Sequence, residues 1–482
     1  MTDNTPVVRI TSTVVMVMSV INDYGSGLAV VLSENDKYIG LVTDGDIRRA
    51  IIKGLSPQDS IESIVNKDAV FGKITDDRDS LLSNLSLDLK AIPLIDNDSN
   101  FVELLQYKDL NIPAAKPGLH GNELLYLTDC VLSNWISSQG EYVDRFESAF
   151  ADFIGTEFAL SCSNGTAALH LALLAGGIEP GDEVIVPSFT WISTANAVKY
   201  IGAVPVFADV NKETLNLDFN TIEELITPKT KAIIPVHIYG QPAEMSHLSQ
   251  YCSDNNLILI EDAAEAHGAK YGDALVGSIG DMGCFSFFGN KIITTGEGGM
   301  VTTNNHDLYN KMRKFRDHGK SDQDPYWHDV VGYNYRMTNM QAAVGLAQME
   351  RVEIILNDKL RISELYKSHL SKIENLILPP DLEWSQNIHW LYCVRIIHPG
   401  ILEEIREKRD KIVAGLEKNS VGARKFFHPI HRMPPYEAYS SNLPITEEIS
   451  ASGICLPSYF GMKDTEIKTI SELLLTFLSK NE

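Results

Sequence analysis

Short apolar runs alternate with helical patterns through the middle of the chain, and this alternation constrains the fold more than any other feature. The strand-like runs cover residues 159–162, 183–187, 203–207, 231–236 and 257–260. Segments with helical spacing separate them. Strands that alternate with helices form a largely parallel sheet with helices on its faces. We therefore predict an α/β domain, whose ligands bind beyond the carboxyl ends of the strands.

The chain is longer than one ordinary domain, since it has 482 residues. Asp and Glu number 64 against 41 Lys and Arg, so the formal net charge is −23. This balance argues against nucleic acids and anionic membranes as general partners. The first residues do not resemble a signal sequence, no run has membrane-spanning length, and six scattered cysteines show no metal spacing. We expect a cytoplasmic protein without a metal site.

Residues 1–112 contain an internal repeat. In the first copy, strand-like runs at 28–32 and 38–42 precede a helix that Asp44 or Asp46 can cap. A weaker copy follows at residues 92–110. The proline-rich segment 111–118 reads as a linker to the remainder of the chain.

Residues 40–47 (GLVTDGDI) resemble the hallmark of a CBS domain, so residues 1–112 would form a CBS-domain pair. The resemblance implies that Thr43 and Asp46 meet an adenine nucleotide, with the carboxylate accepting from the ribose. The second copy is degenerate, because Glu103 and Gln106 replace the expected glycine and threonine and only Asp109 matches. The alternative is a packing or oligomerisation module without a ligand.

Lys291 stands between an aromatic run and a glycine-rich turn. Residues 285–288 read FSFF, and residues 296–299 read GEGG. A lysine in such a position can be desolvated against backbone, and a desolvated amine is a nucleophile toward carbonyls. The alternative is an ordinary surface lysine in a hairpin.

Three further features fall at predicted strand ends. Asp262 follows a buried strand, where a carboxylate needs a cationic or N–H partner. The segment Asn164, Gly165, Thr166 opens a helix, and a helix N-terminus can bind an anion. Trp191 follows another strand. Taken singly, each has an ordinary structural explanation, such as a helix cap for Asp262.

Together these features fit one cofactor, pyridoxal 5'-phosphate. Its aldehyde needs an amine, its ring nitrogen a carboxylate, its ring an aromatic neighbour and its phosphate an anion cup. The corresponding residues are, in the same order, Lys291, Asp262, Trp191, and Gly165 with Thr166. We expect Ser286 to lie near this anion cup.

Residues 112–482 resemble the DegT/DnrJ/EryC1/StrS family, fold-type I aminotransferases that act on nucleotide-linked keto sugars. The matching stretches are residues 135–140, 163–170, 187–191, 236–240, 261–266, 287–291 and 332–337. The resemblance implies a large cofactor-binding α/β domain at 113–370, with a mostly parallel sheet, and a small α+β domain at 371–482.

The same resemblance implies roles for individual residues. Lys291 binds the cofactor and moves protons, and Asp262 holds the ring-nitrogen proton. Glu265 lies near the phenolic oxygen, where many members carry glutamine or histidine. Asn334 reaches the phosphate bound by the other subunit, so the site needs a homodimer or a higher oligomer. Substrate contacts are expected at Trp135, Ser137, His328, Arg424 and His431. For residues 424–431 the alternative is a strand and turn that close over the core.

We therefore expect an aminotransferase that passes the amino group of L-glutamate, through the pyridoxamine phosphate form, to C4 of a nucleotide-linked 4-keto-6-deoxy sugar. Residues 326–339 and Glu265 most resemble members that convert GDP-4-keto-6-deoxy-D-mannose to GDP-perosamine, for O-antigen or other surface polysaccharide. The alternative substrate is a UDP-linked 4-keto-6-deoxy amino sugar of the bacillosamine or legionaminic acid type.

Two other classes of protein fit the sequence less well. Dehydratase relatives carry histidine in place of Lys291. A nucleotide sensor with a dead catalytic domain would not need Lys291, Asp262 and Trp191 intact.

Overall fold

The computed structural model describes residues 5–25, 27–76, 80–81, 84–85, 91–106, 111–324, 326–439 and 441–479. The chain divides into two compact units, Met1–Ile112 and Pro113–Glu482. Among the described residues, no helix combines the length and the apolar composition needed to cross a membrane.

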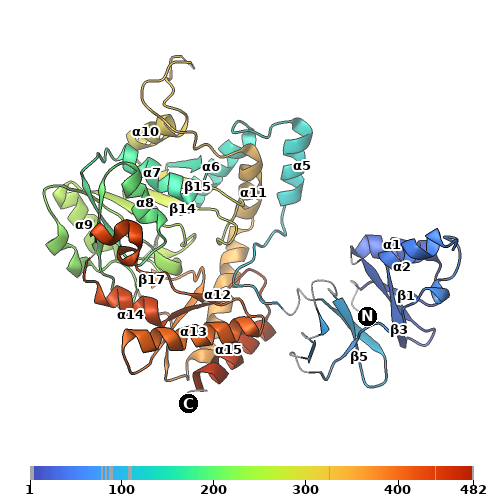
Figure 1. Cartoon of the computed structure of the whole chain (residues 1–482). Helices are drawn as coiled ribbons and strands as arrows, with labels where there is room; N and C mark the ends of the chain where they lie inside the picture. The colour runs from blue at the N-terminus through green and yellow to red at the C-terminus, as the bar shows by residue number, and fades with distance from the viewer. Residues whose placement is uncertain are drawn as a thin grey trace. The chain divides into compact units, whose positions relative to one another are not determined.

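The first unit contains two three-stranded sheets of the same design. In each sheet the first strand is parallel to the second, and the second is antiparallel to the third. The strands are β1 (Val7–Arg9), β2 (Leu28–Leu32) and β3 (Tyr38–Thr43), then β4 (Gly72–Lys73), β5 (Ala91–Ile95) and β6 (Phe101–Gln106). Helices α1 (Val14–Tyr24) and α2 (Asp44–Ile52) cover the first sheet (Figure 1). Asp109 lies outside the described residues.

A seven-stranded sheet forms the centre of the second unit, with the order β7-β15-β14-β11-β10-β8-β9. Only β15 runs against the other six. The largely parallel sheet expected from the sequence is therefore confirmed. The strands are β7 (Phe158–Cys162), β8 (Glu183–Pro187), β9 (Val204–Ala208), β10 (Thr230–Ile233), β11 (Ile258–Asp262), β14 (Met282–Ser286) and β15 (Gly299–Thr303).

Helices cover both faces of this sheet (Figure 1). Because side chains alternate along a strand, Cys284 packs toward one face and Phe285 toward the other. The Cys284 face carries α7 (Gly165–Ala175), α8 (Ser193–Tyr200) and α10 (His306–Arg316). The opposite face carries α6 (Glu141–Ile154), α9 (Met245–Asn255) and α11 (Asn339–Met349), and α5 (Glu123–Ser133) packs on α11.

The long helix α12 (Val352–Leu370) leads from the large sheet to a smaller, antiparallel one. This sheet has the order β16-β18-β20-β19, and its strands are β16 (Leu376–Ile377), β18 (Tyr392–Ile396), β19 (Arg424–Lys425) and β20 (Gly453–Leu456). Helices α13 (Leu402–Lys418), α14 (Pro444–Ser452) and α15 (Asp464–Ser479) complete this part. Short strands β12 (Lys270–Tyr271), β13 (Ala274–Leu275) and β17 (Ser385–Gln386) form a further sheet between segments far apart in the sequence.

Candidate active site

A cavity of about 830 Å³ opens at the carboxyl ends of the parallel strands. Asn164 follows the end of β7 at Cys162, Trp191 lies in the loop that follows the end of β8 at Pro187, and β11 ends on Asp262 itself. Open α/β sheets bind ligands at this edge, because loops from several strands meet there. The predicted site residues that line the cavity are Asn164, Gly165, Thr166, Trp191, Asp262, Glu265, Ser286, Lys291 and Arg424.

Lys291 lies in a short turn that follows β14, and its side chain is only 11 % exposed. Its Nζ is 3.3 Å from Glu265 Oε1 and 3.8 Å from the centroid of the Trp390 ring. The indole Nε1 of Trp390 donates to the carbonyl of Asn290, the residue before the lysine. The amine is therefore held between a carboxylate and an aromatic face at the wall of the cavity, and the surface-lysine alternative does not apply.

Two buried carboxyl groups line the same cavity as this amine. Asp262 Oδ2 accepts from Thr194 Oγ1 at 2.7 Å, and Oδ1 accepts from the Ala264 N–H at 3.2 Å. Burial raises the pKa of Asp262, and these hydrogen bonds only partly offset the rise. Burial likewise raises the pKa of Glu265, whose Oε2 accepts from the Tyr239 N–H at 2.9 Å. Each carboxylate is stabilised when a cation lies close to it.

The N-terminus of α7 forms the other end of the cavity. Asn164 caps the helix, with its Oδ1 accepting from the Ala167 N–H at 2.8 Å. The N–H groups of Gly165 and Thr166 have no acceptor among the described residues, as the first turn of a helix leaves them unpaired. A Cβ on Gly165 would lie 2.8 Å from the Ser286 Cβ, so only glycine fits here. These donors and the helix dipole favour a bound anion.

The residues that line the cavity suit the chemical groups of pyridoxal phosphate. Asp262 is a buried acid with no ion-pair partner among the described residues, which suits a protonated ring nitrogen. The α7 cup suits a phosphate, and Lys291 suits an aldehyde. Trp191, a residue that is 59 % exposed, also lines the cavity and supplies an aromatic side chain there.

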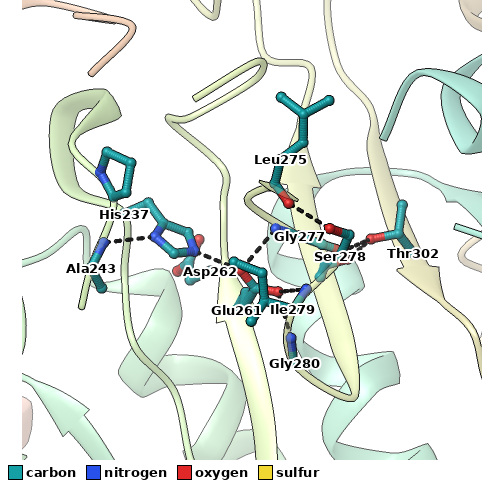
Figure 2. Close-up of polar contacts among 12 residues, drawn as sticks. His237, Ala243, Glu261, Asp262, Leu275, Gly277, Ser278, Ile279, Gly280 and Thr302 are labelled. Atoms are coloured by element: carbon teal, nitrogen blue, oxygen red, sulfur yellow. Dashed lines mark hydrogen bonds and ion pairs between the residues drawn. The ribbon is translucent and has the colours of Figure 1, made fainter. Parts of the chain in front are cut away.

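Behind Asp262, a second carboxyl group fixes the end of β11. Glu261 points to the opposite face of the sheet, is fully buried, and has its Oε2 3.0 Å from His237 Nε2 (Figure 2). It also accepts from the N–H groups of Gly277, Ile279 and Gly280 at 2.7–2.8 Å. Burial alone would raise the pKa of Glu261, but these hydrogen bonds together hold it below its usual value.

The same network reaches the turn that supports Glu265. His237 Nδ1 accepts from the Ala243 N–H at 3.0 Å (Figure 2), and the His237 N–H donates to the Asp262 carbonyl at 3.0 Å. Tyr239, two residues on, has a left-handed backbone (φ 54°) and presents its N–H to Glu265. A β-branched or bulky residue rarely adopts this conformation, so the surrounding contacts impose it.

From the sequence, no role was assigned to Thr194, His237, Tyr239, Glu261 and Trp390. For Glu261 a signal was present, because a charged residue at the end of a buried apolar strand needs partners of its own. No local pattern marks Trp390, which meets Asn290 across 100 residues of sequence.

Four of the predicted substrate or cofactor residues do not line the cavity of the single chain. Trp135, Ser137, His328 and Asn334 are all exposed. The carbonyls of Trp135 and Ser137 accept from Asn339 at 2.7 and 2.6 Å, and His328 Nδ1 is 2.8 Å from the His318 carbonyl.

His431 also lies away from the cavity, because its side chain is fully buried. Its Nδ1 is 2.7 Å from Ser188 Oγ, and its Nε2 is 3.3 Å from Glu447 Oε1. Arg424, on β19, does line the cavity. Of the predicted segment 424–431, the first residue thus faces the site and the last packs in the core, as the alternative explanation expects.

In the first unit, Thr43 and Asp46 form a capping box at the start of α2. Asp46 Oδ2 accepts from the Thr43 N–H and hydroxyl at 3.0 and 2.7 Å, and the Asp46 N–H donates to Thr43 Oγ1 at 3.2 Å. Both side chains therefore stabilise the helix start as well as standing where the CBS resemblance expects a nucleotide.

Comparison with known families identifies the second unit. Residues 118–475 match the DegT/DnrJ/EryC1/StrS aminotransferase family, and residues 1–53 match the CBS domain. The chain belongs to the DegT/DnrJ/EryC1/StrS aminotransferase family. It is accordingly a pyridoxal-phosphate-dependent transaminase of fold type I, as predicted, and it is preceded by a CBS domain that corresponds to the first copy of the predicted pair.

Several members of this family are similar to the chain over most of their length. The GDP-perosamine synthase of Caulobacter vibrioides is 47% identical over 361 residues, which cover 74% of this chain and 96% of that protein. The GDP-perosamine synthase of Escherichia coli O157:H7 is 43% identical over 368 residues, covering 76% and 99%. Spr1654 of Streptococcus pneumoniae, named as a candidate sugar aminotransferase, has been solved in PMP and PLP forms. Its PMP form superposes with a TM-score of 0.72 at 27% identity, covering 77% of this chain and 98% of that one.

Proposed function

We propose that the chain transfers the amino group of L-glutamate to C4 of GDP-4-keto-6-deoxy-D-mannose and so forms GDP-perosamine. The observation that carries the proposal is the meeting of Lys291, Asp262 and the α7 anion cup in one cavity. The similarity of 74% and 76% of the chain to two GDP-perosamine synthases supports the choice of sugar. A surface polysaccharide such as an O-antigen would be the destination of the product.

When bound, pyridoxal phosphate supplies an aldehyde that takes up amino groups and a ring that accepts negative charge. Lys291 Nζ would bind that aldehyde and, as a free amine, would accept the proton from the α-carbon of glutamate. Glu265, 3.3 Å from Nζ, keeps the released amine beside the reacting atoms. Asp262 holds the proton of the ring nitrogen, because its buried carboxylate is stabilised by a positive neighbour.

Other residues bind and orient without moving protons. The N–H groups of Gly165 and Thr166 bind the phosphate, Ser286 lies against Gly165, and Asn164 fixes the helix start. Trp191, which lines the cavity, would offer an aromatic face to the cofactor ring. Arg424 faces the cavity from the small sheet, so its guanidinium is placed to bind the anionic part of the nucleotide sugar.

A direct test supplies the purified enzyme with ¹⁵N-labelled L-glutamate and one keto sugar at a time. We expect mass spectrometry to find label in the GDP-sugar product, and Lys291→Ala to form none. Labelled product from the UDP-linked 4-keto sugar alone would replace this proposal by the UDP alternative. Full turnover by Lys291→Ala would contradict the role given to the lysine.

We also propose that the active form is a homodimer. Helix α5 carries exposed apolar side chains at Leu124 (78%), Leu125 (62%), Val131 (57%) and Leu132 (77%). An exposed apolar patch of this kind fits a protein interface. A second copy of the chain is the partner proposed, because Asn334 is predicted to complete the other subunit's site.

The dimer proposal predicts the behaviour of Leu132→Glu. A carboxylate in an apolar interface cannot be solvated, so the variant should sediment as a monomer and lose activity. Glu141→Gln, an exposed change on α6, serves as the control. A wild-type chain that sediments as a monomer with full activity would contradict the proposal.

For the first unit we propose that an adenine nucleotide binds near Thr43 and Asp46 and regulates the enzyme. The support is the CBS match over residues 1–53. ATP, ADP or AMP should then raise the melting temperature of the wild type, and less so that of Asp46→Ala. Unchanged melting and kinetics with all three nucleotides would leave only the packing role for this unit.

The unpaired state of all six cysteines supports a reducing, cytoplasmic setting.

A further inference from the structure

Lys359 is a buried lysine that the reaction described above does not use. It lies on α12, its residue is 3% exposed, and burial lowers its pKa to about 7. The neighbouring carboxylate, Asp358, pairs with Arg361 instead. Charging the Lys359 amine in this buried place costs free energy. A residue that served packing alone would not need an amine there.

Among the described residues, the amine of Lys359 donates only to neutral oxygens, and these belong to two other segments. Nζ donates to the Trp390 carbonyl at 3.0 Å, to the Ser458 carbonyl at 2.6 Å and to the Ser458 hydroxyl. Its three protons thus have three acceptors. One of those acceptors is the backbone of the residue whose ring lies behind Lys291.

The turn that carries Trp390 is strained and tightly enclosed. His389 has a left-handed backbone (φ 49°), and its buried Nδ1 has no partner among the described residues. The Ser458 hydroxyl donates to the His389 carbonyl at 3.4 Å. On the other side, a Cβ on Gly240 would lie 2.9 Å from the nitrogens of His389 and Trp390. The position of the indole is therefore imposed by its surroundings.

Trp390 connects the two lysines. Its backbone meets Lys359, its indole N–H meets the Asn290 carbonyl at 2.7 Å, and its ring face lies 3.8 Å from Lys291 Nζ. A cation over an aromatic face is attracted to it, so the place of the ring determines where the amine rests.

We propose that Lys359 is a positioning residue: through Trp390 it holds the amine of Lys291 at the cavity wall. This inference rests on the proposed role of Lys291 as the residue that binds the cofactor aldehyde. Lys359 touches neither the cofactor nor the substrate in this account. Its effect should appear only in steps in which the Lys291 amine takes part.

Two small-molecule probes separate this role from a general contribution to folding. The full-length apoenzyme is mixed with pyridoxal phosphate, and the rate of covalent capture is followed by absorbance. Deoxypyridoxine phosphate, which has a methyl group in place of the aldehyde, is measured by equilibrium dialysis. Both probes use the anion cup, but only the first uses Lys291.

Lys359→Met keeps an unbranched side chain one atom shorter than that of lysine and removes its donors. We expect capture of pyridoxal phosphate to slow by about tenfold or more, since small misplacement of a reacting group has effects of this order. The affinity for deoxypyridoxine phosphate should stay near that of the wild type. An unchanged capture rate, or an equal loss with both probes, would overturn the proposal.

Tyr366→Phe is the matched control. Tyr366 is buried on the same helix, and its hydroxyl donates at 2.9 Å to the carbonyl of Pro457, the residue before Ser458. The variant loses a comparable hydrogen bond between the same segments but leaves Trp390 in place. Both probes should behave as with the wild type.

Trp390→Phe keeps the test decisive if Lys359→Met folds poorly. It retains an aromatic ring and loses the bond to Asn290, so capture should slow while Tyr366→Phe remains normal. Equal capture rates for these two variants would overturn the proposal. Lys291→Ala tests the underlying assumption separately: covalent capture by that variant would refute the role of Lys291, on which the inference rests, whereas normal capture by Lys359→Met would refute only the role of Lys359.

Discussion

Asp262 combines full burial with the absence of a cation among its described contacts, and this combination gives it its proposed use. A carboxylate there is costly until a positive group binds next to it. Asp262→Asn keeps the shape and removes the charge, so the ring-nitrogen proton is no longer held. We expect kcat to fall by roughly 100-fold or more, as when one preorganised electrostatic partner is removed. Steady-state kinetics of amino transfer give kcat for this variant. A kcat within a few-fold of the wild type would contradict the role given to Asp262.

Glu261 makes a prediction about stability rather than turnover. Its pKa lies below the ordinary value near 4.5, because hydrogen bonds from His237 and backbone N–H groups outweigh the effect of burial. A lowered folded-state pKa contributes stability that is fully present above the unfolded-state pKa and is lost as the pH falls through the folded-state pKa. The wild type should therefore lose unfolding free energy as the pH drops below about 4.5.

Glu261→Gln should be less stable by about 3 kcal/mol near neutral pH, because backbone donors lose a charged acceptor. It should also lose less stability than the wild type on acidification. Urea unfolding followed by tryptophan fluorescence reports on the second unit alone, since all five tryptophans lie there. The exposed Glu141→Gln should change little. Parallel pH curves for Glu261→Gln and the wild type would contradict the account.

At the scale of elements, the start of α7 determines where the phosphate can bind. Gly165→Ala would place a methyl group 2.8 Å from the Ser286 Cβ, in the space between the helix and β14. We expect the affinity for pyridoxal phosphate to fall about tenfold or more, because the N–H groups of the cup are displaced. Equilibrium dialysis against the apoenzyme gives the value. An affinity equal to that of the wild type would show that the cup lies elsewhere.

Elements with an uninterrupted pattern could be read from the sequence. The predicted strand at 183–187 is β8 with the same bounds. The predicted strand at 231–236 ends early, at Ile233, because Pro235 has no N–H for the ladder.

The residues that meet at the strand ends could also be predicted, because a parallel sheet gathers its carboxyl ends at one edge. Lys291, Asp262 and Gly165 follow this rule. Trp390 and Lys359 could not be predicted, since their contacts with the site depend on how the small sheet packs against α12. His431 appeared to be a substrate residue from its basic and aromatic neighbours, whereas packing places it in the core.

The whole chain is longer than the two GDP-perosamine synthases that it matches. The two GDP-perosamine synthases align over 96% and 99% of their own length with only 74% and 76% of this chain. Residues 113–482 form a compact unit with its own core. We expect this fragment to fold and to keep kcat within a few-fold of the full chain. Its rate should not respond to adenine nucleotides. A fragment that folds but is inactive would show that the first unit contributes to catalysis.

We propose that the site around Lys291 transfers an amino group from glutamate to a GDP-linked keto sugar. The most direct measurement is the absorbance spectrum of the purified holoenzyme, taken before and after L-glutamate and again after GDP-4-keto-6-deoxy-D-mannose. The account predicts that glutamate removes the long-wavelength band of the lysine-bound cofactor and that the GDP sugar restores it, while a UDP-linked 4-keto sugar does not. A band that glutamate leaves unchanged, or that only the UDP sugar restores, would contradict it.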